Sequence, residues 1–204
     1  MQELHLTQEW DKVFPKSDKV DHKKVTFTNH FGITLAADQY TPKNYEGKLP
    51  ALAVAGPFGA VKEQSSGLYA QTMAEKGHLT IAFDPSFTGE SGGDVRDVFS
   101  LDINTEDYQA AVDYLSNLSN VDPEKIGIIG ICGWGGISLN AAAINPRIKA
   151  TAAVTMYDMP QVGAWGYFDQ WTAEERYASK KQIAEQRTKE YSQQDLAKAG
   201  GCDD

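Results

Sequence analysis

The sequence predicts an α/β protein built on a doubly wound, mostly parallel sheet. Short apolar runs alternate four times with segments whose apolar residues recur at helical spacing, which is typical of strands joined by crossover helices. Several of these runs are almost continuously apolar, as expected for strands buried on both faces. An alternating polar and apolar segment near the N-terminus adds an antiparallel hairpin to the sheet.

Composition favours a single domain and excludes several classes of partner. The chain has 204 residues, of which 41% are hydrophobic, enough for one substantial core. Its net charge of -9 disfavours nucleic acids and anionic membranes as partners. No signal-peptide pattern or long apolar stretch is visible, which predicts a cytoplasmic protein without membrane contact. The two cysteines, Cys132 and Cys202, lack zinc-site spacing, and we expect neither a metal nor a cofactor.

The first elements follow from local patterning. Residues 1–22 are polar with scattered apolar anchors and are predicted to form a short helix and a tether. Residues 24–28 and 33–40 flank a glycine-containing turn and predict the hairpin. Residues 49–55 predict the first buried strand, and the tight turn Gly56–Gly59 follows it.

The middle of the chain continues the alternation. A helix over residues 64–76 and a strand over 79–83 come first. A second helix is predicted over 105–118, with Asn104 or Thr105 as its cap and a turn at 121–124 after it. A strand over 125–131 leads into the glycine-rich turn.

The alternation ends after Asp158. An alanine-rich helix over 134–144 and a strand over 148–156 precede this point. Residues 172–198 are charged and helical in composition, with a capping box at Thr172 and Glu175. The predicted division is therefore an N-terminal segment 1–22, an α/β core 23–158, and the start of a helical lid or cap over 159–204.

The stretch Ile126–Gly136 carries the clearest chemical signal. An apolar strand stops at Cys132 and a helix opens directly after it, which is the arrangement of a nucleophile elbow. Such a tight turn requires small residues nearby, and four glycines supply them: Gly130, Gly133, Gly135 and Gly136. The positive end of the following helix favours a thiolate at Cys132. The alternative is an inert cysteine at the end of a buried strand.

An oxyanion hole is predicted beside Cys132. The Gly133 N–H at the start of the helix is one donor, and the loop after the strand 49–55 is expected to supply the other. Because Pro57 has no N–H group, the second donor is predicted to be Phe58. Gly56, Pro57, Trp134 and Glu90 are predicted to line a substrate pocket, with a packed core aromatic as the alternative for Trp134 and a solvated loop as the alternative for Glu90.

These motifs resemble the α/β-hydrolase superfamily, close to its dienelactone-hydrolase-like and X-Pro-dipeptidyl-peptidase-like branches. The resemblance covers residues 23–158 and rests on Gly56–Gly59, on Phe83–Gly93 and on Gly130–Trp134. It implies hydrolysis of a small-molecule ester, lactone or amide through an acyl-enzyme at Cys132. The sequence departs from the family pattern at Trp134, because a small residue is usual two positions after the nucleophile.

The resemblance also implies a catalytic acid and a histidine after the nucleophile in chain order. All four histidines precede Cys132: His5, His22, His30 and His78. We therefore expect a truncated chain that lacks the C-terminal strands and is inactive alone, with the base and acid beyond residue 204. Asp158 is a second candidate for the acid, and its alternative is a loop or helix-entry residue.

Other readings remain open. A hydrolase fold without catalysis would act as a binding module. The stretch Gly133–Ser138, followed by Asp158, partly imitates a dinucleotide fingerprint.

Asp84 is expected to hold its own loop in place by hydrogen bonds, and Arg96 is near the expected site. The strand 148–156 would leave an unpaired sheet edge, which predicts homo-oligomers.

Overall fold

The computed structural model describes residues 3–194 and 196–197, so Cys202 lies outside the described part of the chain. The chain divides into two compact units, residues 1–158 and residues 159–204. The boundary falls where the strand-helix alternation of the sequence ends. Each unit is described by itself.

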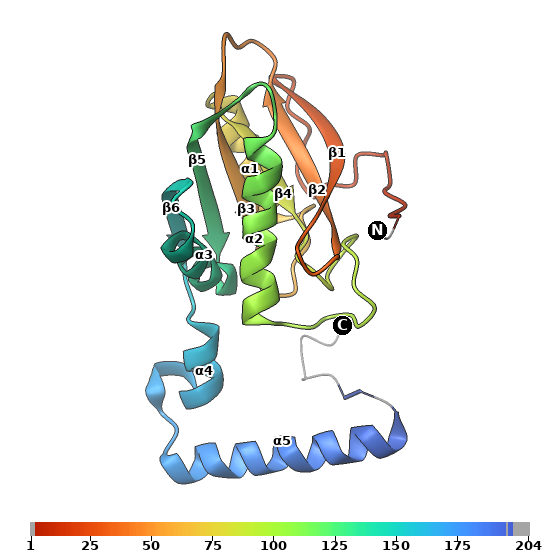
Figure 1. The fold of residues 1–204 in the computed structure, drawn as a ribbon, viewed down its shortest axis with the longest axis vertical. Helices are drawn as coiled ribbons and strands as arrows, with labels where there is room; N and C mark the ends of the chain where they lie inside the picture. The colour runs from red at the N-terminus through yellow and green to blue at the C-terminus, as the bar shows by residue number, and fades with distance from the viewer. Residues whose placement is uncertain (1–2, 195, 198–204) are drawn as a thin grey trace. The chain divides into compact units, whose positions relative to one another are not determined.

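The first unit is built on a six-stranded mixed sheet in the order β1-β2-β4-β3-β5-β6. Its N-terminal hairpin is antiparallel, and β2 also pairs antiparallel with β4, whereas β4, β3, β5 and β6 are mutually parallel (Figure 1). The strand bounds are β1 Val20–Thr28, β2 Thr34–Pro42, β3 Leu49–Ala55, β4 Leu79–Phe83, β5 Val121–Ile131 and β6 Ile148–Val154. The predicted mostly parallel sheet led by an antiparallel hairpin is confirmed.

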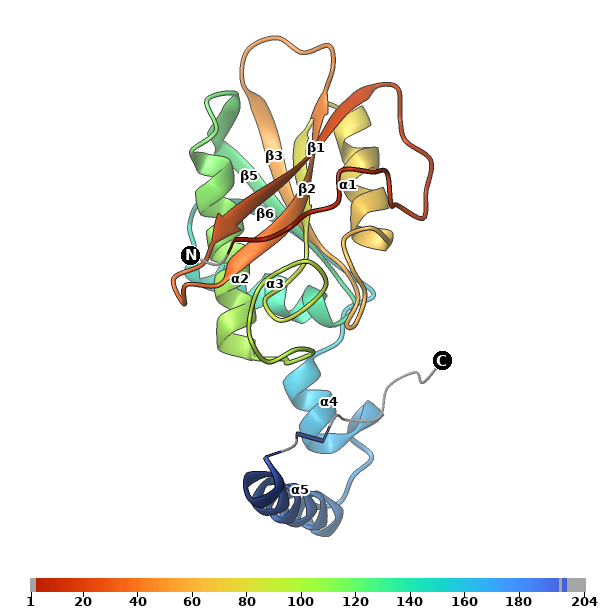
Figure 2. The same cartoon turned by 90° about the vertical axis from the view of Figure 1, so that its right-hand side faces the viewer.

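Helices cover both faces of this sheet. The three helices of the unit are α1 Ser65–Glu75, α2 Leu101–Ser116 and α3 Gly133–Ile144. In Figure 2, α1 lies on the opposite side of the sheet from α2. Successive side chains of β3 point to opposite faces of the sheet, which explains the two layers. Ala53 packs in the cluster with α2 and α3, and Val54 packs in the cluster with α1.

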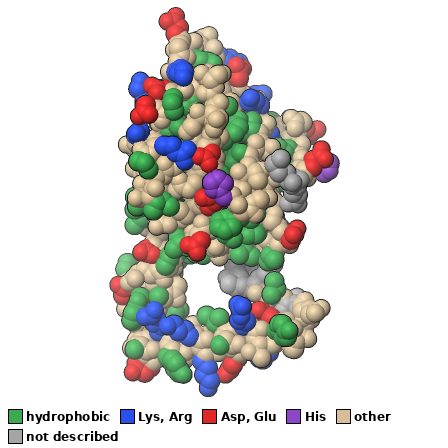
Figure 3. All heavy atoms as spheres, in the orientation of Figure 1, with side chains coloured by type: hydrophobic (Ala, Val, Ile, Leu, Met, Phe, Trp, Pro, Cys, Tyr) green, Lys and Arg blue, Asp and Glu red, His purple; other side chains and the backbone are tan. Residues whose placement is uncertain are grey.

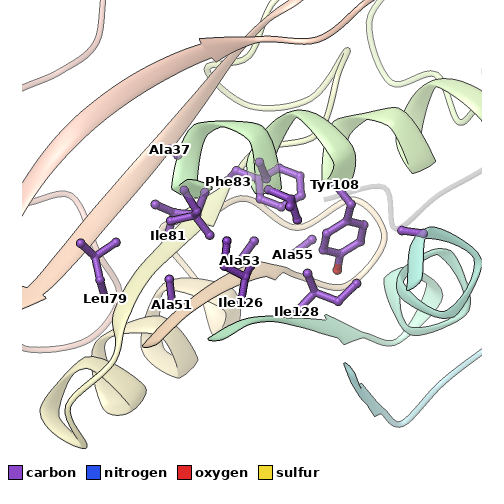
Figure 4. Packing of buried hydrophobic residues seen from close by; sticks show 14 of the residues in the cluster. Ala37, Ala51, Ala53, Ala55, Leu79, Ile81, Phe83, Tyr108, Ile126 and Ile128 are labelled. Atoms are coloured by element: carbon purple, nitrogen blue, oxygen red, sulfur yellow. The ribbon is translucent and has the colours of Figure 1, made fainter. Parts of the chain in front are cut away.

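The larger cluster forms the core beneath α2 and α3. Small residues of β3 lie beside larger ones from β4, β5 and α2, and Figure 4 shows Phe83 and Tyr108 close together over these strands. Their rings meet edge to face with centroids 5.3 Å apart. The apolar runs of β3, β4 and the second half of β5 are therefore buried as predicted, whereas β6 is only partly buried.

Three local predictions are wrong. The described part of residues 1–22 contains no helix before β1, because tertiary contacts hold it extended: Val13 N–H donates to the Glu63 carbonyl and Lys12 pairs with buried Asp38. Helix α2 begins at Leu101, not at 105, because Ser100 caps it by accepting from Ile103 N–H. Residues 121–124 belong to β5, since Val121 pairs with Leu49 instead of forming a turn.

The described part of the second unit contains α4 Met159–Trp165, the short helix η1 Tyr167–Asp169 and the 21-residue helix α5 Ala173–Gln193. The predicted capping box is confirmed, since Thr172 and Glu175 each accept from the other's backbone N–H. The helix is shorter at its end than the predicted span 172–198. Helix α4 was not predicted, because its sequence contains Pro160 and Gly163.

Candidate active site

Cys132 is the single residue between the end of β5 and the start of α3. Its backbone has φ 58° and ψ -124°, a conformation that is costly for any residue with a side chain. The surrounding backbone enforces it: Cys132 N–H donates to the Val154 carbonyl at 2.9 Å, and the Cys132 carbonyl accepts from Gly135 N–H at 2.9 Å and from Tyr157 N–H at 3.1 Å. The turn therefore has the strained geometry of a nucleophile elbow.

The glycines of the turn are required by close backbone approaches. A Cβ atom at Gly130 would lie 2.1 Å from the Trp134 carbonyl oxygen, and one at Gly136 would lie 2.7 Å from the Tyr157 carbonyl oxygen. The space around Gly136 is thus filled by the segment that follows β6. Glycine at position 136 is therefore explained by close packing against this segment.

Trp134 belongs to the core of the first unit. Its side chain is 4% exposed and its ring lies near those of Phe83 and Tyr108, with centroids 6.1 Å and 5.7 Å away. This position agrees with the alternative of a packed aromatic, and a pocket-lining role for Trp134 stays a prediction. The unusual residue at this elbow position is accommodated because its side chain points into the core, away from the turn.

The predicted oxyanion loop forms a tight turn after β3. Ala60 N–H donates to the Pro57 carbonyl at 3.1 Å, and Gly59 adopts φ 75°, which favours glycine. Among the described residues, no backbone carbonyl accepts from Phe58 N–H. The Gly133 N–H opens α3, where the first N–H groups of a helix have no intrahelical acceptor. The Phe58 side chain is 42% exposed and meets Phe99 edge to face, with centroids 4.9 Å apart.

A buried ion cluster that the sequence did not reveal lies between the loops after β3 and β4. Lys62 is fully buried, and its Nζ atom lies 2.6 Å from Glu63, 2.8 Å from Asp84 and 2.6 Å from Glu90. Burial alone would lower the pKa of Lys62, but the facing carboxylates, with Asp84 first, raise it above the usual range. Nothing in local sequence marks Lys62, since burial of a lysine is decided by distant residues.

Glu90 is part of this cluster. Its carboxylate accepts from Lys24 and Lys62, each at 2.6 Å, and from Thr7 N–H at 3.2 Å. These contacts do not fit the alternative of a solvated loop residue, and the pocket role of Glu90 stays a prediction. Arg96 instead donates to the Ser91 and Gly89 carbonyls, so it braces the same loop from within.

A second buried cluster holds the start of the loop after β4. Asp107 on α2 is fully buried and accepts from Ser86 N–H at 2.9 Å, from Asn104 at 3.0 Å and from Asn29 at 2.8 Å. Burial raises the pKa of Asp107 above its usual range, although the hydrogen bonds oppose this shift. The cluster joins the hairpin turn, the β4 loop and α2.

Asp158 is exposed, and its Cα atom would lie 3.8 Å from a Cβ atom built at Gly136. The backbone at Asp158 therefore passes the first turn of α3, close to the elbow. The histidines have other partners: His22 bonds Asp38 at 2.7 Å, His30 in the hairpin turn faces Glu106 at 3.1 Å, and His78 Nδ1 lies 3.2 Å from the Met73 carbonyl. The structure pairs none of these three with Cys132.

Within the described residues, no group of three or more His, Cys, Asp or Glu side chains is placed to hold a metal ion. No helix in the described part of the chain has the length and apolar character needed to cross a bilayer. On the face shown in Figure 3, acidic and basic side chains are interspersed.

Comparisons with known proteins identify the family of this fold. The uncharacterized protein PA2218 of Pseudomonas aeruginosa is 62% identical over 189 residues, which cover 92% of this chain and 51% of that protein. Its crystal structure superposes with a TM-score of 0.94 over all of this chain and 66% of that one, at 56% identity. The acyltransferase drtE of Aspergillus calidoustus is 31% identical over 137 residues, 67% of this chain and 44% of that protein.

The fold is also that of known esterases. Acetyl xylan esterase 1 from Thermoanaerobacterium has a TM-score of 0.67 over 89% of this chain and 60% of its own, at 18% identity, which shows the shared α/β-hydrolase fold. The chain spans about half the length of the curated relatives described here. A family model described as X-Pro dipeptidyl-peptidase (S15 family) matches residues 32–200. The chain therefore belongs to the X-Pro dipeptidyl-peptidase (S15) family of α/β hydrolases.

Proposed function

We propose that the protein transfers acyl groups to water through Cys132, hydrolysing a small-molecule ester, lactone or amide. The observation that carries this proposal is the strained conformation of Cys132 at the only residue between β5 and α3. Strain of this kind persists only where the surroundings impose it, and it is typical of catalytic residues. The acyltransferase and esterase among the similar proteins support acyl-transfer chemistry.

In the proposed reaction, the Cys132 sulfur attacks the carbonyl carbon of the substrate and the leaving group departs with a proton. Water then releases the acyl group. The N–H groups of Gly133 and Phe58 would stabilise the negative oxygen that forms in each step. Asp158 remains a candidate acid because its backbone passes close to α3. The cysteine nucleophile, the resemblance to the dienelactone-hydrolase branch and a cytoplasmic location are all parts of this proposal.

The experiment compares ester turnover by the full-length gene product with turnover by its Cys132→Ala variant, using p-nitrophenyl acetate and butyrate. Cys202→Ala serves as the matched control, since it removes the other cysteine of the sequence. We expect Cys132→Ala to lose at least about 99% of turnover and Cys202→Ala to keep it. Acylated protein trapped at low pH should carry the acyl group on Cys132. Equal turnover by wild type and Cys132→Ala would refute the nucleophile.

A non-catalytic binding module is the second candidate. It is kept as a candidate because, within the described residues, His22, His30 and His78 contact Asp38, Glu106 and the Met73 carbonyl instead of Cys132. A module of this kind would bind esters without turnover and without acylation of Cys132. The acylation measurement on the full-length gene product therefore separates the two functions.

A further inference from the structure

Asp84 is a fully buried carboxylate just after β4 that holds two loops at once. Its Oδ1 atom accepts from the backbone N–H of Lys62 at 2.8 Å. Its Oδ2 atom accepts from Lys62 Nζ at 2.8 Å and from Glu90 N–H at 2.9 Å. Residue 62 lies in the loop after β3, and residue 90 lies in the loop after β4. One side chain therefore fixes both loops.

Lys62 has little freedom to move in this arrangement. Its ammonium is shared among Asp84, Glu63 and Glu90, and its side chain is fully buried. Its carbonyl oxygen lies so close to α1 that a Cβ atom at Gly67 would be 2.4 Å away from it. Removing one partner of a buried charge is costly, because the remaining charge is left without compensation. The backbone at Lys62 is thus held by Asp84 at its N–H group and by close contact with Gly67 of α1 at its carbonyl oxygen.

Phe58, the proposed oxyanion donor, lies four residues before Lys62. The connection consists of two successive turns, closed by Ala60 N–H to the Pro57 carbonyl at 3.1 Å and by Gln64 N–H to the Val61 carbonyl at 3.0 Å. Such hydrogen-bonded turns leave few backbone conformations open. The direction of the Phe58 N–H is therefore coupled to the position of Lys62.

We propose that Asp84 is a positioning residue for the oxyanion hole, which orients the Phe58 N–H by clamping Lys62. This inference rests on the proposed function, because the role of Phe58 as a donor does. A donor held in place before the reaction stabilises the charge of the transition state without reorganising. Loss of the clamp should therefore slow the chemical step and leave substrate binding largely unchanged.

Asp107 provides a matched comparison. It is as buried as Asp84 and accepts hydrogen bonds from the same β4 loop, at Ser86. Among the described residues, the hydrogen bonds of its carboxylate go to Asn29, Ser86 and Asn104, none of which belongs to the loop after β3. Asp107→Asn therefore perturbs a buried carboxylate without touching the clamp.

The first test is backbone amide hydrogen exchange in the full-length gene product. We expect Asp84→Asn to speed exchange over residues 56–62 by about tenfold or more while α2 stays protected. Asp107→Asn should change the exchange rates of residues 56–62 by about twofold or less. Unchanged exchange in folded Asp84→Asn would overturn the proposal, and so would an equal increase in both variants, since that would indicate general loosening.

If Asp84→Asn does not fold, the double variant Lys62→Met/Asp84→Asn replaces it. It removes the two fully buried charges together, and Glu63 and Glu90 keep Lys24 as a partner at 3.4 Å and 2.6 Å. The proposal requires faster exchange over residues 56–62 in this variant as well. Wild-type protection of that loop in the folded double variant would overturn it.

The second test is the kinetics of p-nitrophenyl ester hydrolysis. Asp84→Asn should lower kcat by about tenfold or more with KM within about threefold, as expected for a group that acts on the transition state. Asp84→Glu, which keeps the charge, should recover part of kcat. Asp107→Asn should have the kcat of the wild type. A raised KM with unchanged kcat would overturn the positioning role. Absence of turnover in the wild type would overturn the proposed function and the oxyanion role with it, while hydrogen exchange would still decide whether Asp84 holds the loop.

Discussion

Gly130 faces the Trp134 carbonyl oxygen so closely that a Cβ atom at position 130 would lie 2.1 Å from it. The same added atom would lie 2.8 Å from the Ser138 Cβ atom. The end of β5 and the first turn of α3 are therefore in direct backbone contact. This contact is what allows one residue, Cys132, to join a strand to a helix.

Gly130→Ala should lower the free energy of unfolding by about 2 kcal/mol or more, because neither backbone can move away without breaking the elbow. Urea unfolding followed by tryptophan fluorescence measures the change. Gly163→Ala is the control, since nothing lies within 4 Å of a Cβ atom built there. We expect that control to be neutral or slightly stabilising. A Gly130→Ala variant as stable as wild type would contradict the close contact.

Cys132→Gly should be more stable than Cys132→Ala by about 1–2 kcal/mol. Glycine adopts φ 58° and ψ -124° without the steric cost that alanine keeps, and its greater freedom in the unfolded chain offsets only part of this gain. Urea unfolding of the two variants under identical conditions checks the difference. Equal stability, or a more stable alanine variant, would show that the elbow is not strained.

Trp134→Ala should lower the free energy of unfolding by about 3–5 kcal/mol, as expected for a large aromatic in the core. Phe58→Ala, at an aromatic that is 42% exposed, should cost about 1 kcal/mol or less and should keep the Phe58 N–H in place. Thermal or urea unfolding of the two variants measures these free-energy costs. Similar small costs for both would contradict the core position of Trp134.

Glu90→Gln should reduce stability in a pH-dependent way. Burial tends to raise the pKa of Glu90, but hydrogen bonds from Lys24 and Lys62 outweigh it and hold the pKa below its usual value. The folded state thus binds this proton less tightly than the unfolded state, so the stabilisation is present above about pH 4.3 and is lost as the pH falls through the lowered pKa.

We expect Glu90→Gln to cost about 1 kcal/mol at pH 7 and progressively less toward pH 3. Urea unfolding at both pH values measures this difference. Glu174→Gln, at an exposed position on α5, is the control and should have little effect at either pH. A Glu90→Gln cost that grows as the pH falls would contradict the sign of the shift.

The 204-residue chain should self-associate through β6. Among the described strands, β6 pairs only with β5, so its other edge is open to pairing. Ala152→Lys/Ala153→Lys places charges at exposed positions of this strand and should lower association in size-exclusion chromatography across a concentration series. Ala178→Lys/Ser192→Lys adds the same charge on exposed positions of α5 and should not. A monomeric wild-type chain would contradict the prediction.

Local sequence determined the features that depend on periodicity and on short motifs. The sequence predicted the alternation of strands and helices from β1 to β6, the elbow at Cys132 and the capping box at Thr172, because apolar spacing, glycine positions and the Thr172–Glu175 pair encode them directly. The family also follows from these motifs, since they lie in the stretch matched by the family model.

Tertiary structure alone decided which polar side chains are buried and with which partners. Lys62, Asp84 and Glu90 come from two loops after different strands, and only the packing of those loops desolvates them together. The N-terminal segment is extended because Lys12 reaches Asp38, and Trp134 lies in the core because α3 turns it toward Tyr108. Burial and ion pairing depend on residues far apart in the chain, whereas periodicity depends on near neighbours.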